Sequence, residues 1–265
     1  MPPGSTLLTW VEQLQSRGRY TFTRTEVESD TGRSFVAAQT ALRRLKQQGR
    51  LVSPRRGFYV VVPPEYRATG SPPASWFIDD LMHHLGRPYY VGLLSAAALH
   101  GAAHQQPMVF QVVTGKPTRE MRAGKVTIRF SMSRLVERMP VTEMQTETGS
   151  MHVATPETTA FDLVRHPIAA GHLSNVATVL TELAERMGGE ALATIAPLVR
   201  LPDVQRLGYL LDAIGQDELA APLGAWLQGQ RARVAHLIPA EPASVDVDVD
   251  ERWRVLPNAA LETDL

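Results

Sequence analysis

The chain has 265 residues and a formal net charge of zero, and its 44% of hydrophobic residues can fill the core of one large or two modest domains, which excludes a disordered chain. It contains no cysteine, which excludes disulfide bonds and thiolate metal sites. The N-terminal sequence lacks the pattern of a signal peptide, and no apolar run approaches the roughly 18 residues of a membrane span, so we expect a cytoplasmic protein without a membrane partner.

The balanced total charge hides an uneven distribution. Residues 1–62 carry ten basic and four acidic side chains, whereas residues 239–265 carry seven acidic and two basic ones. A basic segment attracts a polyanion and an acidic segment repels one. The charge distribution therefore favours the N-terminal segment as the face that contacts nucleic acid.

Two helices are predicted at the start of the chain. Apolar residues recur at helical spacing from Leu7 to Leu14 and predict a first helix that ends near Gly18. Thr25 can cap a short second helix, which the sequence Asp30-Thr31-Gly32 then breaks.

A third helix is predicted from an N-cap at Ser34 to a stop at Gly49, and its two faces differ in chemistry. The face toward the core consists of Ala38, Ala41, Leu42 and Leu45. Most of the remaining surface consists of Gln39, Thr40, Arg43, Arg44, Lys46 and Gln47. A helix of this kind fits the major groove of DNA, where Arg pairs with guanine and Gln with adenine.

A small β-ribbon follows, with strands at residues 51–52 and 58–62 around a turn at residues 53–57. Arg55 and Arg56 lie in that turn and can reach phosphates or a narrow minor groove. Two helices and a basic-tipped hairpin in this order predict a winged helix-turn-helix; the alternative is a solvated amphipathic helix followed by an ordinary hairpin. The predicted DNA contacts are Ser34, Gln39, Thr40, Arg43, Arg44, Lys46, Arg55 and Arg56.

Two proline clusters, at residues 63–64 and 70–73, predict a linker. The predicted organisation is a DNA-binding domain at residues 1–63, a linker at residues 64–74 and a larger domain at residues 75–265. The fold class is α+β, because the larger domain combines a small sheet with a C-terminal helical bundle.

The elements predicted in the larger domain follow from periodicity and turn signals. Helices are expected at residues 75–85, within 90–107, and at 155–164, 175–187, 190–199, 202–214 and 218–228. Strands are expected at residues 109–114, 126–131, 144–148 and 150–154, the last two turning at Gly149, and an edge strand in the alternating sequence at residues 245–250. The loop between the first two strands is basic and is a possible secondary DNA contact, although connecting loops are solvated by default. Its basic residues are Lys116, Arg119, Arg122 and Lys125.

The sequence gives little support to an enzyme. His100 and His104 have the spacing of two metal ligands on one helix face, but no glutamate lies between them as a metalloprotease requires. The sequence contains no glycine-rich phosphate loop and no G-x-S-x-G motif. We therefore predict no catalytic residue, no metal and no cofactor.

Three other groups of ionisable residues have simpler interpretations than a site. The adjacent His83 and His84 suit a surface or capping role, and Asp162 suits a structural ion pair with Arg165 or another buried partner. The alternating Asp246, Asp248 and Asp250 could hold a cation, but a solvated acidic edge that prevents sheet pairing is the simpler explanation.

The order of the motifs resembles the AbiEi family of antitoxins and transcriptional regulators from type IV toxin–antitoxin systems of phage defence. The motifs are ALRRLKQQGRLVSPRRGFYVV, YVGLLSAAALHG, VFQVVTGKP, KVTIRF and TPETTAFDLVRHP, and the resemblance covers nearly the whole chain. The closing sequence VDVDVDERWRVLPN is only loosely similar to the last strand of the family.

The resemblance implies a function for each domain. The winged helix would bind inverted repeats in the protein's own promoter and repress the operon, with Gln39, Thr40, Arg43 and Arg44 on the recognition helix and Arg55 and Arg56 on the wing. The larger domain would act as antitoxin against a nucleotidyltransferase toxin without forming a stable complex. Two alternatives are a nucleic-acid-processing enzyme that the winged helix delivers to DNA, and a ligand-sensing repressor without a toxin.

Overall fold

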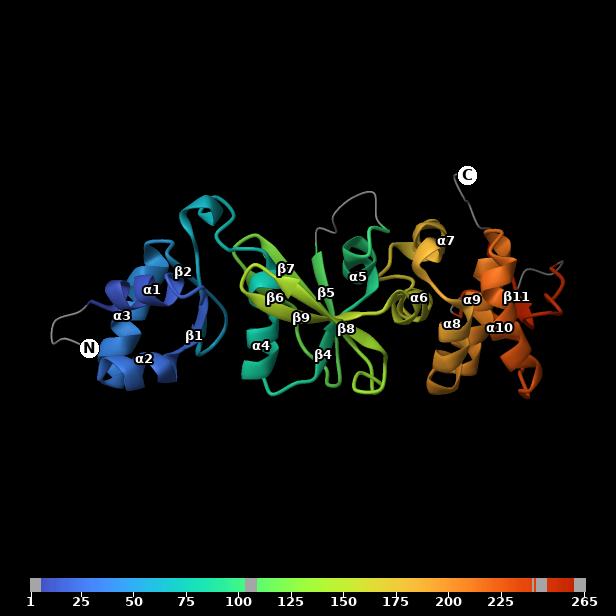
Figure 1. The fold of residues 1–265 in the computed structure, drawn as a ribbon, viewed down its shortest axis with the longest axis horizontal. Coiled ribbons are helices and arrows are strands. Elements are labelled where there is room, and N and C mark those ends of the chain that lie inside the picture. Colours follow the sequence, from blue (N-terminus) through green and yellow to red (C-terminus); the bar gives the residue numbers. More distant parts are fainter. Residues whose placement is uncertain (1–5, 103–108, 240, 242–246, 260–265) are drawn as a thin grey trace. The chain divides into compact units, whose positions relative to one another are not determined.

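The computed structural model describes residues 6–102, 109–239, 241 and 247–259, and it has the predicted mixed α+β fold (Figure 1). The chain divides into two compact units. Unit 1 comprises Met1–Tyr89, Met108–Ser133 and Glu143–His152, and unit 2 comprises Tyr90–Pro107, Arg134–Thr142 and Val153–Leu265. This division does not test the predicted boundary at residues 64–74, which stays a prediction.

Unit 1 begins with the predicted helices and ribbon. In chain order its first elements are α1 (Leu7–Gln15), β1 (Thr21–Thr23), α2 (Arg24–Thr31), α3 (Phe35–Gln47), β2 (Leu51–Arg55) and β3 (Phe58–Val61). β1 was not predicted, because three residues with one apolar side chain carry no periodic signal. It forms a strand by pairing antiparallel with β3, so that the sheet order is β1-β3-β2.

Two local predictions in this segment were wrong. The N-cap of α2 is Thr23 and not Thr25, because Thr23 stands three residues before Glu26 and the two exchange hydrogen bonds as a capping box. The ribbon turn is shorter than expected, since β2 continues to Arg55, which pairs with Phe58 after a register shift. Gly57 in this tight turn has a φ of 85°, which an L-residue adopts only with strain.

A six-stranded sheet follows, with the strand order β6-β7-β5-β4-β9-β8. The elements between residues 64 and 154 are η1 (Pro64–Tyr66), η2 (Ala74–Trp76), α4 (Ile78–His84), β4 (Tyr89–Val91), α5 (Leu93–Leu99), β5 (Val109–Thr114), β6 (Met121–Ala123), β7 (Val126–Met132), β8 (Val141–Thr146) and β9 (Gly149–Ala154). The predicted strands β5 and β7 are confirmed and pair in parallel. The short strands β4 and β6 were not predicted, and the β8–β9 turn precedes Gly149, which is already in β9.

The helices of unit 2 confirm the predicted bundle. They are α6 (Pro156–Arg165), α7 (His172–Leu183), η3 (Ala184–Arg186), α8 (Gly189–Ile195), η4 (Ala196–Leu198), α9 (Leu201–Ala213) and α10 (Asp217–Gln228), followed by the short parallel strands β10 (Ala235–His236) and β11 (Val255–Leu256). α6 is central to this unit, because every residue from Glu157 to Val164 is buried. It packs against α5, α7, α8 and α9.

The predicted edge strand at residues 245–250 was wrong for its described part. Residues 247–249 have no strand, and Asp250 makes one isolated antiparallel bridge to Val255. The cause is Trp253, which is fully buried and donates its indole N–H to Asp212 at 2.6 Å. The bulky ring anchors this segment to α9, so the alternation of Val and Asp does not decide its conformation. Asp246 lies outside the described residues.

Gly208 in α9 makes room for the Trp253 ring. A Cβ atom at this position would overlap three atoms of the ring, whereas at Gly229 it would make an ordinary contact of 3.5 Å. Gly208→Ala is therefore expected to lower the free energy of unfolding by about 1–3 kcal/mol or more, because the core cannot absorb an added methyl group without moving Trp253. Chemical denaturation measures this, with Gly229→Ala as the control that should stay near the wild type. An unchanged Gly208→Ala variant would contradict the packing described here.

Asp162 of α6 is buried without the predicted ion pair. It accepts a hydrogen bond from the Tyr90 hydroxyl at 3.3 Å, and its Oδ2 atom has no hydrogen-bond partner among the described residues. Burial raises the pKa of Asp162 to about 7, against the opposing effects of Tyr90 and Arg165. Arg165 is near enough to act electrostatically, but it lies at the partly exposed end of α6, and no ion pair joins it to the carboxyl group in the described structure.

The raised pKa of Asp162 predicts a dependence of stability on pH. Protonated Asp162 contributes to the free energy of unfolding, and this contribution is complete below the pKa of Asp162 in the unfolded chain, near 4. It is lost as pH rises through the folded pKa of about 7, at roughly 1.4 kcal/mol for each unit of pKa difference. Asp162→Asn cannot ionise, so the decline in unfolding free energy between pH 5 and pH 8 is expected to be smaller than in the wild type. Denaturation at a series of pH values measures this, and the exposed Asp248→Asn is the control. An identical pH profile in the Asp162 variant would refute the assignment.

Candidate nucleic-acid interface

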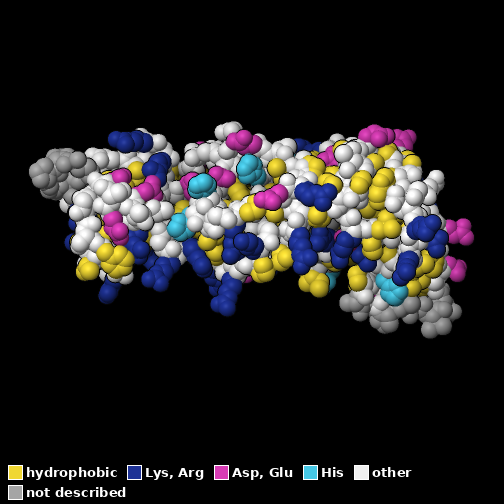
Figure 2. All heavy atoms as spheres, turned by 90° about the horizontal axis from the view of Figure 1, so that it is seen from below, with side chains coloured by type: hydrophobic (Ala, Val, Ile, Leu, Met, Phe, Trp, Pro, Cys, Tyr) yellow, Lys and Arg dark blue, Asp and Glu magenta, His cyan; other side chains and the backbone are white. Residues whose placement is uncertain are grey.

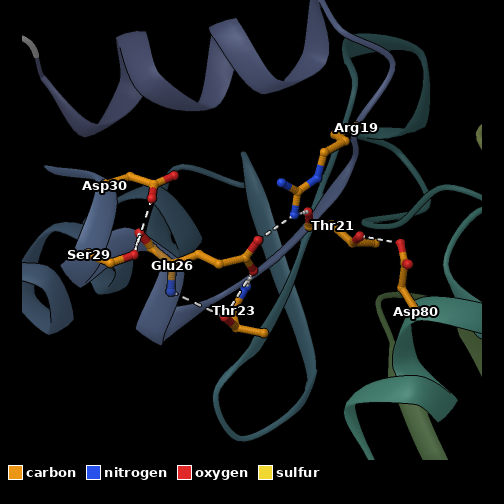
Figure 3. Close-up of polar contacts among 7 residues, drawn as sticks. All are labelled: Arg19, Thr21, Thr23, Glu26, Ser29, Asp30 and Asp80. Carbon is orange, nitrogen blue, oxygen red and sulfur yellow. Dashed lines mark hydrogen bonds and ion pairs between the residues drawn. The ribbon is translucent and has the colours of Figure 1, made fainter. Parts of the chain in front are cut away.

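The start of α2 is fixed by a cluster of polar contacts in unit 1 (Figure 3). The Glu26 carboxylate accepts hydrogen bonds from the Thr23 backbone N–H at 2.7 Å and from the Arg19 guanidinium at 2.6 Å. Burial raises the pKa of Glu26, but these hydrogen bonds outweigh it, so the pKa lies below its usual value. On the other side of β1, the Thr21 hydroxyl donates to Asp80 of α4. These contacts hold α2 in place before the turn into α3.

The helix α3 begins and ends as predicted. The Ser34 hydroxyl accepts a hydrogen bond from the Ala37 N–H at 3.4 Å, and Gly49, with a φ of 67°, follows the C-terminus. Ala38, Leu42 and Leu45 are buried in the core of the module, with Ala41 partly buried. The opposite surface of α3 is therefore left for solvent or a ligand.

All of the residues predicted to contact DNA are exposed. Five of them lie on α3, Ser34 caps this helix, and two lie at the end of the wing. They are Ser34, Gln39, Thr40, Arg43, Arg44, Lys46, Arg55 and Arg56. The Ser34 hydroxyl is occupied by the cap, so its role in the described structure is to start the helix.

Ion pairs neutralise some arginines of the module and leave others unpaired. Arg19, Arg24 and Arg50 pair with Glu26, Glu28 and Glu12 at distances of 2.6, 3.1 and 3.8 Å. Among the described residues no acidic side chain pairs with the basic residues of α3 or the wing, which are Arg43, Arg44, Lys46, Arg55 and Arg56. Positive charge is thereby concentrated on the predicted face.

A groove of about 420 Å³ runs beside α3. It is lined by Gln39, Arg43, Lys46 and Gln47 and by Tyr59 of β3. Burial raises the pKa of the Tyr59 hydroxyl, which stays a neutral donor at physiological pH. Tyr59 was missed by the sequence analysis, because a tyrosine in a strand carries no signal that separates core from groove.

A second cleft of about 450 Å³ brings the wing together with the basic loop. Arg55 of the wing, Arg119 of the loop and Arg87 line it, and Arg87 is held by hydrogen bonds to the Pro117 carbonyl at 3.2 Å and to the Thr118 hydroxyl. Arg87 was also missed, since it stands alone between two elements. Its place in the cleft depends on the packing of the loop against it, which the sequence does not show.

The basic loop differs from the loop that was expected. It contains β6, which pairs antiparallel with β7, and it also contains Glu120, which bridges Arg122 and Arg129 at 3.2 and 3.1 Å. Hydrogen bonds from both arginines lower the pKa of Glu120. Arg122 is thus neutralised, whereas Lys116, Arg119 and Lys125 are exposed without an acidic partner among the described residues.

The described residues do not support the alternative metal site. The His100 ring nitrogen Nε2 lies 2.7 Å from the Ala154 carbonyl oxygen, so it has a structural partner, and His104 lies outside the described residues. No three His, Asp or Glu side chains in the described part of the chain lie close enough to hold a metal ion.

His84 packs against Phe58, with ring centroids 5.4 Å apart. None of the described helices is long and apolar enough to cross a membrane.

The geometry defines a protein with an N-terminal winged helix-turn-helix module followed by a larger mixed α+β region. Two family models match it: "AbiEi antitoxin C-terminal domain" at residues 90–213 and "Transcriptional regulator, AbiEi antitoxin" at residues 11–62. Both describe one family and together cover more than half of the chain, so the chain belongs to the AbiEi antitoxin family of transcriptional regulators, as the resemblance indicated. Family membership implies DNA binding, and the family consists of regulators and not of known enzymes.

The fold also has a solved counterpart. The crystal structure of RV2827C protein from Mycobacterium tuberculosis superimposes with a TM-score of 0.63 at 18% sequence identity, over 93% of this chain and 90% of that chain. At this identity the likeness shows the fold alone. The comparison with curated proteins finds no match.

The capping box of α2 can be tested with two neighbouring threonines. Thr23→Ala removes the hydroxyl that caps α2 and is expected to lower the free energy of unfolding by about 1 kcal/mol, whereas the exposed Thr25→Ala should have little effect. Because the pKa of Glu26 is lowered, its contribution is present above its unfolded pKa and is lost as pH falls through the folded value. Thermal denaturation at neutral and acidic pH measures both effects. Equal effects of the two substitutions would contradict the assigned cap.

Proposed function

We propose that this protein is a sequence-specific repressor that binds inverted repeats of double-stranded DNA in its own promoter and also acts as the antitoxin against a nucleotidyltransferase toxin. The observation that carries the DNA-binding part is the separation of charges in the module. Acidic side chains neutralise Arg19, Arg24 and Arg50, and the basic residues of α3 and the wing are left to meet phosphates.

The proposed contacts divide into two kinds. Gln39 and Arg43 line the groove beside α3 and suit base edges in the major groove, with Thr40 on the same exposed surface. Arg44 and Lys46 on α3, and the arginines of the wing, suit phosphates, which position the helix. Each phosphate contact adds to the salt dependence of binding, and each base contact adds to discrimination between sequences.

We propose a secondary contact to the DNA backbone at the cleft between the wing and the basic loop. Arg55, Arg87 and Arg119 line this cleft, and such a cluster of guanidinium groups suits a phosphate. Lys116 and Lys125 extend the positive surface of the loop, whereas Arg122 contributes less because Glu120 is bound to it. The cleft would lengthen the contact with DNA beyond the wing.

The antitoxin part of the proposal concerns the region matched to the AbiEi antitoxin C-terminal domain, residues 90–213. Its support is the family match and the well-packed helical core around α6. We propose that it counteracts the toxin in the cytoplasm without a stable complex. Repression and toxin neutralisation would then depend on different residues of the chain.

A binding experiment tests the proposal. The protein is titrated onto the DNA directly upstream of its gene, with a scrambled duplex as competitor, at several salt concentrations. Arg43→Ala with Arg44→Ala is expected to weaken specific binding, since each lost phosphate contact lowers the salt slope by about 0.9 and each lost base contact costs about 1–3 kcal/mol. The same double variant is expected to retain neutralisation of the co-expressed toxin.

The matched control is Arg231→Ala with Arg233→Ala, which removes the same charge from exposed positions of unit 2. It should leave DNA binding unchanged. If the wild-type protein does not bind the upstream DNA at low salt, the proposed repressor function is wrong. If the toxin arrests growth although the full-length protein is co-expressed, the proposed antitoxin function is wrong.

A further inference from the structure

Two hydrophobic side chains at the start of α3 are exposed in a module that buries most others. Phe35 is 46% exposed and Val36 is 69% exposed, and among the described residues up to Val62 they are the only exposed large hydrophobic side chains. In Figure 2 hydrophobic side chains lie beside Lys and Arg over α2 and α3. Exposed apolar surface at such a position marks a place where a ligand can cover it.

Phe35 has a structural role that explains part of its exposure. The Arg24 guanidinium lies over its ring, 4.5 Å from the ring centroid, and Arg24 is itself paired with Glu28 at 3.1 Å. This stack joins α2 to the first residue of α3 and fixes the start of the recognition helix. No contact of this kind explains the exposure of Val36, the next residue.

Val36 belongs to the surface that faces the proposed DNA. Residues three, four and seven positions after it, namely Gln39, Thr40 and Arg43, lie on the same side of the helix. The Thr40 hydroxyl donates to the Val36 carbonyl at 2.9 Å, so its proton is already used within the helix. The side of α3 nearest its N-terminus is therefore mainly apolar, and the polar readers follow one turn later.

We propose that Val36 reads thymine by contact with its 5-methyl group, assisted by the methyl group of Thr40. This inference rests on the proposed function and specifies the sequence that the operator contains. The N-terminal residues of a recognition helix contact base edges, and the thymine methyl is the apolar group in the major groove that an apolar side chain recognises. Each half-site then has a thymine beside the base pairs that Gln39 and Arg43 read.

The expected strength of the contact follows from the burial of one methyl group. At about 0.8 kcal/mol for each buried methyl-sized group and 1.4 kcal/mol for each factor of ten, loss of one methyl weakens binding about fourfold per half-site. This is smaller than the effect of losing a bidentate base contact. The methyl contact therefore contributes to discrimination between DNA sequences and adds little to the overall affinity for DNA.

The experiment begins with selection of binding sites from a pool of randomised duplexes by the full-length wild type. The selected duplex is then made in two forms, one with thymine and one with deoxyuridine at single positions, which removes only the methyl group. Both forms are titrated with the wild type, with Val36→Ser, and with Val234→Ser. Val234 is an exposed valine of unit 2, so its substitution removes the same atoms away from the proposed interface.

The expected result is a loss of about fourfold at one thymine position per half-site for the wild type and for Val234→Ser, and a clearly smaller loss for Val36→Ser, which keeps only the assisting methyl group of Thr40. A wild type that selects a defined site but binds the thymine and uracil forms equally would overturn the role of Val36 and leave the repressor intact. The same methyl dependence in Val36→Ser as in the wild type would overturn it too. Failure to select any sequence would instead overturn the sequence-specific DNA binding on which the inference depends.

Discussion

The burial of one side of α3 determines which of its residues can meet DNA. Ala38, Leu42 and Leu45 lie in a core that includes Trp10 and Phe22, whose rings meet edge to face at 5.1 Å. Burying a leucine side chain contributes about 1.5–3 kcal/mol, so rotating the helix to present another side would cost several such contributions. The core thus fixes the rotation of the helix, and the outward residues follow from it.

Contacts outside the core fix the start of the same helix. The capping box of α2, the hydrogen bond from Arg19 to Glu26 and the stack of Arg24 on Phe35 hold α2 against the start of α3. These contacts use arginines and acids in pairs, so they add positional order without adding net charge. In the described structure no acidic side chain pairs with the basic residues of α3 and the wing. The ion pairs around α2 therefore orient the recognition helix and leave its own positive charge unneutralised.

Unit 2 shows a different use of polar groups. Gln205 is buried and its side-chain amide donates to the backbone carbonyls of Arg233, Trp253 and Arg254, and Trp253 fits against Gly208. These contacts attach the end of the described chain to α9 beyond the region that matches the family. Asp162, in contrast, is buried, and among the described residues its carboxyl group accepts a hydrogen bond only from the Tyr90 hydroxyl, while burial raises its pKa.

The sequence by itself determined the helices, the longer strands and the exposed basic face, because these depend on local periodicity. The apolar spacing from Ala38 to Leu45 located α3, and the alternating faces of that helix identified its exposed residues. Short strands such as β1 and β6 could not be predicted, since a strand of three residues is stabilised by its partner and not by its own sequence. Only the tertiary structure placed Arg87 and Tyr59 beside the predicted contacts and showed which arginines are neutralised, because those facts depend on distances between residues far apart in the chain. It also decided the conformation of the C-terminal segment, where burial of the Trp253 ring outweighs the alternating pattern around it.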